Sequence, residues 1–185
     1  ALYGVRYDAE HEITVTAGAT QALFTAIAAF VRKGDEVIVF EPCYDSYVPS
    51  IETVGGRALH AQLRFPDYKP DWNQVSSLIS PRTRMIIINS PHNPTGSLLD
   101  ADDLAALAEI TRDTDVIVLS DEVYEHIVFD GVRHASVATH PELAARSIAV
   151  SSFGKTYHIT GWKIGYVFGA AALMAVVDST ELATM

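Results

Sequence analysis

Short apolar runs rich in β-branched residues alternate with segments of helical periodicity, and this alternation restricts the possible folds more than any other feature. The runs Met85–Ile88 and Val116–Leu119 are continuously apolar, which is typical of strands buried on both faces of a parallel sheet. We expect strands at Ile13–Thr16, Glu36–Phe40, Arg57–Gln62, Met85–Asn89, Val116–Ser120, Ser147–Ser151 and Lys163–Phe168. We expect helices at Ala19–Lys33, Ser46–Val54, Asp71–Ile79, Asp100–Asp113, Pro141–Ala144 and Ala170–Met185. The pattern predicts a layered α/β fold.

Composition narrows the class of protein. The 185 residues are 49% hydrophobic, enough for one domain with a buried core. The net charge is −10, with no cluster of Lys or Arg, which argues against nucleic acid or an anionic membrane surface as a partner. The single cysteine, Cys43, excludes a disulfide framework and fits a reducing compartment. We therefore expect a cytoplasmic protein.

The two ends of the sequence suggest a piece of a longer protein. The chain begins at Ala1 without a methionine and stops at Met185 inside a predicted helix. We expect residues 1–185 to be one domain that is truncated at both ends.

Polar residues follow the predicted strands, at the sheet edge where α/β proteins bind ligands. After the first strand, Gly18, Ala19 and Thr20 form a small-residue turn that opens a helix, and free N–H groups there can bind an anion. An ordinarily capped helix start is the alternative. After the second strand, Tyr44 can stack on a flat ring or serve as a core aromatic residue.

The next two strands are followed by an amide and a carboxylate. Asn93 lies in the loop Ser90–Gly96 and offers a donor to a phenolate-type oxygen. Its neighbour His92 has no second ligand at metal spacing, which favours a structural role. Asp121 ends a buried strand and needs a positive partner, such as a protonated ring nitrogen, although a helix N-cap is nearly as good an interpretation. Tyr124 would face the same site.

After the sixth strand come Ser152 and Lys155, followed by Lys163. Lys155 stands among aromatic residues, and desolvation together with the Lys163 cation would lower its pKa and favour the neutral amine that Schiff-base chemistry needs. Two surface lysines are the alternative.

Together these residues resemble the class I/II aminotransferases, which are pyridoxal-phosphate enzymes of fold type I. Within that family the sequence is most similar to bacterial methionine aminotransferases and to kynurenine/glutamine aminotransferases. The resemblance rests on segments that occur in the family's order and spacing: Val15–Leu23, Pro42–Tyr44, Asn93–Gly96, Ser120–Tyr124 and Ser151–Thr156.

The resemblance implies a three-layer α/β/α large domain, lacking the C-terminal small domain, and the cofactor pyridoxal 5′-phosphate. It also implies cis peptide bonds before Pro42 and Pro94. The implied catalytic residues are Lys155 as the Schiff-base lysine and proton carrier, Asp121 as the partner of the pyridinium nitrogen, and Tyr124. The implied cofactor contacts are Tyr44 on the ring face, Asn93 and Tyr124 at the phenolic oxygen, and Gly18, Ala19, Thr20, Ser152 and Lys163 at the phosphate.

The implied reaction is transamination of an L-amino acid, with methionine or an aromatic or glutamine-like donor, to its 2-oxo acid, in a homodimer. No metal is implied. Three alternatives stay open: β-elimination from cysteine conjugates on the same scaffold, a pyridoxal-phosphate-sensing domain of a transcription regulator, and a catalytically inactive structural domain.

Overall fold

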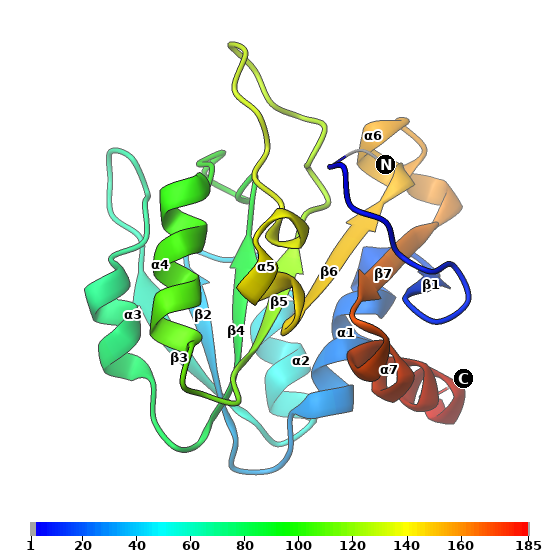
Figure 1. The fold of residues 1–185 in the computed structure, drawn as a ribbon, viewed down its shortest axis with the longest axis horizontal. Coiled ribbons are helices and arrows are strands. Elements are labelled where there is room, and N and C mark those ends of the chain that lie inside the picture. Colours follow the sequence, from blue (N-terminus) through cyan, green and yellow to red (C-terminus); the bar gives the residue numbers. More distant parts are fainter. Residues whose placement is uncertain (1–2, 185) are drawn as a thin grey trace.

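In the computed structural model, which describes residues 3–184, the strands form one seven-stranded sheet with helices on both faces (Figure 1). The strand order is β1-β7-β6-β5-β4-β2-β3. Strand β7 runs antiparallel to β1 and β6, and the other strand pairs are parallel. The bounds are β1 Ile13–Thr16, β2 Glu36–Glu41, β3 Arg57–Gln62, β4 Thr83–Asn89, β5 Ile117–Asp121, β6 Ser147–Ser152 and β7 Gly165–Gly169. The predicted α/β fold with a mostly parallel sheet is confirmed.

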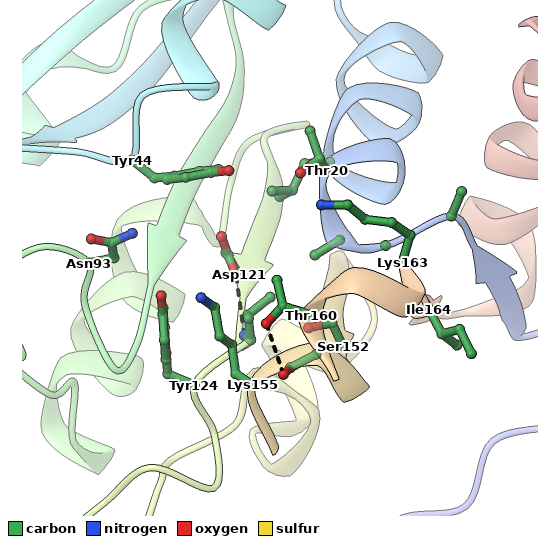
Figure 2. A pocket seen from close by; sticks show the side chains of 16 residues that line it. Thr20, Tyr44, Asn93, Asp121, Tyr124, Ser152, Lys155, Thr160, Lys163 and Ile164 are labelled. Carbon is green, nitrogen blue, oxygen red and sulfur yellow. Dashed lines mark hydrogen bonds between the residues drawn. The ribbon is translucent and has the colours of Figure 1, made fainter. Parts of the chain in front are cut away.

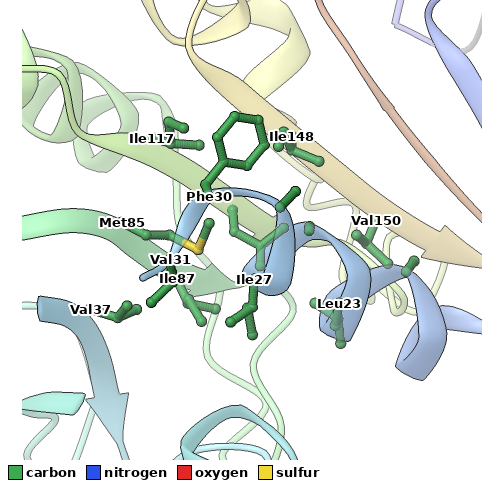
Figure 3. Close-up of a cluster of buried hydrophobic side chains, with 14 of the residues drawn as sticks. Leu23, Ile27, Phe30, Val31, Val37, Met85, Ile87, Ile117, Ile148 and Val150 are labelled. Carbon is green, nitrogen blue, oxygen red and sulfur yellow. The ribbon is translucent and has the colours of Figure 1, made fainter. Parts of the chain in front are cut away.

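The central strands are apolar throughout because their alternate side chains enter two different cores. On one face, Val37, Met85 and Ile87 belong to one buried cluster with Leu23 and Ile27 of the first helix (Figure 3). On the other face, the neighbours of these strand residues pack against the helix of residues 101–111 in a second cluster, with members Ile38, Ile86, Ile88, Leu104 and Leu107. The sheet is therefore the middle of three layers.

The helices fall close to their predicted positions. They are α1 Ala19–Phe30, α2 Tyr47–Thr53, α3 Trp72–Leu78, α4 Ala101–Thr111, α5 Pro141–Ala144, α6 Phe153–Thr156 and α7 Ala171–Thr184, with 3-10 turns η1 Val137–Thr139 and η2 Thr160–Trp162. The sequence analysis missed α6, η1 and η2. Met185, the predicted end of the last helix, lies outside the described residues.

The predicted extension of α1 to Lys33 is wrong. The chain becomes extended at Val31, and the Arg32 side chain folds back to donate hydrogen bonds to the Ala28 and Ala29 carbonyl oxygens at 2.7 and 2.8 Å. These bonds satisfy carbonyl groups that have no partner within the helix. Arg32 therefore caps the helix from outside its last turn.

The topology brings several strand ends together. The carboxyl ends of β1, β2, β4, β5 and β6 lie at one edge of the sheet, where antiparallel β7 begins. Among the residues that the structure describes, no helix is both long and apolar enough to cross a membrane.

Candidate active site

A pocket of about 510 Å³ opens at this carboxyl edge (Figure 2). All ten residues that the sequence analysis assigned to cofactor binding line it: Gly18, Ala19, Thr20, Tyr44, Asn93, Asp121, Tyr124, Ser152, Lys155 and Lys163. The lining also includes Ala17, Leu23, Val123, Gly154, Thr160 and Ile164, which sequence reasoning did not select. The topology therefore gathers residues from almost the whole length of the chain into one cavity.

One end of the pocket is built around the start of α1. Gly18 is the N-cap with φ +85°, and no side chain caps the helix, so the first N–H groups remain available. The interpretation as an ordinarily capped helix start is therefore wrong. Positive φ is the region that favours glycine, so the backbone conformation at Gly18 explains the residue type there.

Gly165, the first residue of β7, allows the strand to lie directly against this helix start. A Cβ on Gly165 would lie 2.6 Å from the Gly18 carbonyl carbon and 2.7 Å from the Ala19 nitrogen. Real Cβ atoms do not approach backbone atoms so closely. Glycine at this position therefore keeps the helix start and β7 at their observed spacing.

We expect Gly165→Ala to displace the start of α1 and to weaken the binding of the phosphate group that the sequence resemblance implies at this end of the pocket. Overpacking of this kind costs about 1–3 kcal/mol of stability. Isothermal titration with pyridoxal phosphate and with pyridoxal separates a loss of phosphate binding from a general loss of stability. Only the phosphorylated compound should lose affinity if the effect is on phosphate binding. The matched control is Gly161→Ala, since a Cβ there meets nothing within 4 Å. Equal losses for both compounds would contradict the role given to Gly165.

Two polar side chains complete this end of the pocket. Ser152 is buried at the end of β6. Lys163 follows η2 with φ +53°, and its side chain points into the pocket in Figure 2. The turn between them is fastened by the Thr160 hydroxyl, which donates to the Gly154 carbonyl oxygen at 3.1 Å. This end thus combines helix N–H groups, a hydroxyl and a cation, which are the groups that bind phosphate.

Asp121 is a buried carboxylate near the centre of the pocket, with 5% of its surface exposed. It is the last residue of β5, and a turn follows it rather than a helix, so the helix N-cap interpretation is wrong. Its Oδ2 accepts a hydrogen bond from the Tyr47 hydroxyl at 2.6 Å, and its Oδ1 accepts from the Val123 N–H at 3.2 Å. No cationic side chain within residues 3–184 forms an ion pair with it. Burial raises the pKa of Asp121 to about 6.

The Asn89 side chain connects the backbone of Asn93 to Asp121 at the end of β5. The Asn89 side chain accepts from the Asn93 N–H at 2.7 Å and donates to the Asp121 carbonyl oxygen at 2.9 Å. His92 has the structural role expected of it, because its Nδ1 is hydrogen-bonded to the Thr95 hydroxyl at 2.8 Å. The expected cis peptide bonds precede Pro42 and Pro94, and two more precede Pro66 and Pro91.

Tyr124 lies in a turn between two buried glutamates. Glu122 accepts hydrogen bonds from the Ser120 hydroxyl and the Val137 N–H and is paired with His134 at 2.9 Å. Glu125 accepts from the hydroxyl groups of Ser151, Tyr166 and Tyr3. These hydrogen bonds of the two carboxylates hold the turn in place, and the Tyr124 side chain lines the pocket.

Lys155 lies in α6 with its Nζ 5.7 Å from the centre of the Tyr124 ring. Figure 2 shows its side chain reaching toward Asp121 and Tyr124. The expected desolvation of Lys155 is wrong for the described residues, since the side chain is exposed. The reason is that its aromatic neighbours Phe153 and Tyr157 contact each other and are themselves partly open to solvent.

Tyr44 is held by a residue that sequence reasoning did not single out for the site. The rings of Tyr44 and Tyr47 meet edge to face, with centroids 5.6 Å apart. Tyr47 is only 3% exposed. A polar atom on an otherwise buried aromatic residue requires a partner, but the sequence does not show that this partner is Asp121.

Comparison with known proteins gives a consistent result. The family model for aminotransferase class I and II matches residues 1–182. Methionine aminotransferase of Escherichia coli K12 is 51% identical over 95% of this chain and 46% of its own length. The structure of YbdL from Escherichia coli, described as having a methionine aminotransferase function, matches with a TM-score of 0.97 and 49% identity over 100% of this chain and 49% of its own.

A more distant structure carries a cofactor. Cystalysin from Treponema denticola, which contains pyridoxal 5′-phosphate, matches with a TM-score of 0.89 and 25% identity over 93% of this chain and 45% of its own. The chain thus spans about half the length of the relatives that it matches.

Proposed function

Because this chain belongs to the class I and II aminotransferase family, we propose that the full-length protein transfers the amino group of an L-amino acid to a 2-oxo acid, with pyridoxal 5′-phosphate as its cofactor. One observation carries the proposal. Three features line the same pocket: a lysine amine, an open helix start, and a buried carboxylate that has no cationic partner among residues 3–184. We also propose that residues 1–185 form most of the large domain, since the relatives are about twice as long.

The residues present fit this cofactor. Asp121 is buried and has no cationic partner in the part of the chain that the structure describes, and the protonated ring nitrogen would supply one. The uncapped start of α1, Ser152 and Lys163 offer donors to a phosphate at the other end. The pocket volume of about 510 Å³ lies within the usual range of small-molecule sites.

Each side chain would have a distinct task. Pyridoxal phosphate supplies an aldehyde that reacts with amines and a ring that withdraws electrons from the substrate Cα. Asp121 holds the proton on the ring nitrogen and so maintains that withdrawal. Asn93 and Tyr124 donate hydrogen bonds to the phenolic oxygen, and Tyr44 stacks on the ring face. Gly18, Ala19, Thr20, Ser152 and Lys163 hold the phosphate.

Lys155 would have two roles. Its amine would hold the cofactor through a bond to the aldehyde carbon, with the carbonyl oxygen leaving as water. As a free amine, it would take the proton from the substrate Cα and return it later in the exchange. The position of Nζ supports both roles, because the amine lies beside the Tyr124 ring and points toward Asp121 (Figure 2).

Methionine is the donor that we propose first, because the methionine aminotransferase relative is 51% identical to this chain. We expect the full-length protein to convert methionine and a 2-oxo acid into the methionine-derived oxo acid and a new amino acid. Chromatography of both products is the measurement, with aromatic amino acids and glutamine as competing donors. Ammonia and pyruvate from a cysteine conjugate, without amino transfer, would instead indicate β-elimination. Cofactor binding with no turnover of any donor would favour a sensing domain.

The full-length protein is proposed to be a cytoplasmic homodimer. Large aromatic side chains are exposed near the pocket, with Tyr157 64% and Trp162 72% exposed. Exposed apolar side chains that gather beside a site mark surfaces that another chain covers. A second copy would also enclose Lys155 and supply the desolvation that this chain alone does not.

A further inference from the structure

The hydroxyl of Tyr47 contacts the pocket's buried carboxylate from behind. Tyr47 is the first residue of α2, and its side chain does not line the pocket. It packs in the core between the sheet and α1 and is only 3% exposed. Its hydroxyl donates to Asp121 Oδ2 at 2.6 Å. No second hydrogen-bond partner for this hydroxyl occurs among residues 3–184, so the hydroxyl donates to Asp121 alone.

The same residue also fixes the wall of the pocket. The Tyr47 ring meets Tyr44 edge to face at 5.6 Å, and Tyr44 is the side chain proposed to stack on the cofactor ring. Burial and the neighbouring Asp121 raise the pKa of Tyr47 well above its usual value, so the hydroxyl keeps its proton and remains a donor. Tyr47 therefore joins two pocket residues that come from different strand ends.

We propose that Tyr47 is a positioning residue that orients the Asp121 carboxylate toward the cofactor ring and keeps it ionised. This inference rests on the proposed function, because the group oriented is the partner of the ring nitrogen. With Oδ2 held by Tyr47 and Oδ1 held by the Val123 N–H, the carboxylate plane is fixed from two sides. A hydrogen bond donated to a carboxylate favours its charged form.

Tyr47→Phe removes the hydroxyl and retains the ring that packs against Tyr44. Tyr166→Phe is the matched control, because the Tyr166 hydroxyl also donates to a carboxylate, Glu125 at 3.1 Å, and neither residue lines the pocket. In the full-length protein we expect Tyr47→Phe to raise the Kd for pyridoxal phosphate about tenfold. Tyr166→Phe should change that Kd less than about twofold.

A second readout needs no cofactor. The ionisable groups that influence Asp121 are Tyr47 from α2, whose donor lowers its pKa, and Glu122 on the same segment, which raises it. Tyr124, Lys155 and Lys163 share the pocket with it. We expect Tyr47→Phe to move the pH midpoint of the Asp121-linked stability change upward by about one unit, and Tyr166→Phe to leave it in place.

The outcomes separate the two proposals. A wild-type protein that does not bind pyridoxal phosphate would contradict the proposed function, whereas the pH midpoint would still test Tyr47. Unchanged values for Tyr47→Phe, or equal changes for Tyr166→Phe, would overturn the inference. A double-mutant cycle with Asp121→Asn adds a third test, because Tyr47→Phe should have little further effect on Kd once the carboxylate is absent. Additive losses would overturn it as well.

Discussion

Replacing Lys155 with alanine is expected to lower transamination by at least about 10³-fold and to abolish the absorption band of lysine-bound pyridoxal phosphate. The amine would be lost both as the covalent link and as the proton carrier at the substrate Cα, and such combined roles are not replaced by neighbouring groups. Absorbance before and after borohydride reduction, followed by peptide mass spectrometry, is the measurement. In the wild-type protein the label should be on Lys155.

The main alternative to Lys155 as the covalently linked lysine lies in the same pocket. Lys163 is a second lysine in the same cavity, and a band that persists in Lys155→Ala with the label on Lys163 would transfer the covalent role to the other end of the site. The structure argues against that outcome, because Lys163 lies against the backbone of Gly18 at the start of α1. Lys33→Ala serves as the control, since Lys33 is exposed in the loop after α1 and outside the pocket.

Replacing Asp121 with asparagine is expected to change activity and stability in opposite directions. Transamination should fall by about 10²-fold or more, because a neutral amide does not hold the proton on the ring nitrogen. The cofactor-free protein should become more stable near neutral pH. Burial raises the pKa of Asp121 to about 6, above the value of 3.8 for an unperturbed aspartate. The folded state therefore binds the proton more tightly than the unfolded state.

The direction of the pH effect follows from this difference. The contribution of the protonated carboxyl group is fully present below pH 4 and is lost as pH rises through 6. The loss amounts to about 3 kcal/mol for a shift of this size, and asparagine does not undergo it. Urea unfolding of both cofactor-free proteins at pH 4 and pH 8 is the measurement. Asp113→Asn, at an exposed carboxylate, is the control. If the difference in free energy of unfolding between the wild type and Asp121→Asn were the same at pH 4 and pH 8, the raised pKa of Asp121 would be contradicted.

The fold could be predicted where local signals were strong. The bounds of β1 and β3 match the expectation, and glycines lie close to both strands in the sequence, at Gly18 and at Gly55–Gly56. By contrast, α1 stops three residues early because Val31 adopts an extended conformation and Arg32 caps the helix from outside. The gathering of the ten pocket residues was predictable because parallel strands end at one edge. Their roles remain predictions.

The residues that hold the site in place were harder to foresee. Tyr47, Asn89 and Glu122 each form a hydrogen bond with a group that another segment supplies, as when Tyr47 of α2 donates to Asp121 of β5. A single sequence records the residue type but not the partner that packing selects. The sequence analysis also missed Thr160, whose hydroxyl donates to the Gly154 carbonyl oxygen within the same turn.

The contact between Gly18 and Gly165 has a consequence for how the protein is made. The start of α1 comes from an early part of the sequence and the start of β7 from a late part, so the anion-binding end of the pocket exists only after β7 has joined the sheet between β1 and β6. Pairings between distant segments form slowly, after local helices and neighbouring strands. During synthesis on the ribosome, the segment through β5 would expose apolar sheet surface before it could hold any ligand. Retention of pyridoxal phosphate would then report that β7 has joined the sheet, and a growing chain too short to include Gly165 should not retain it.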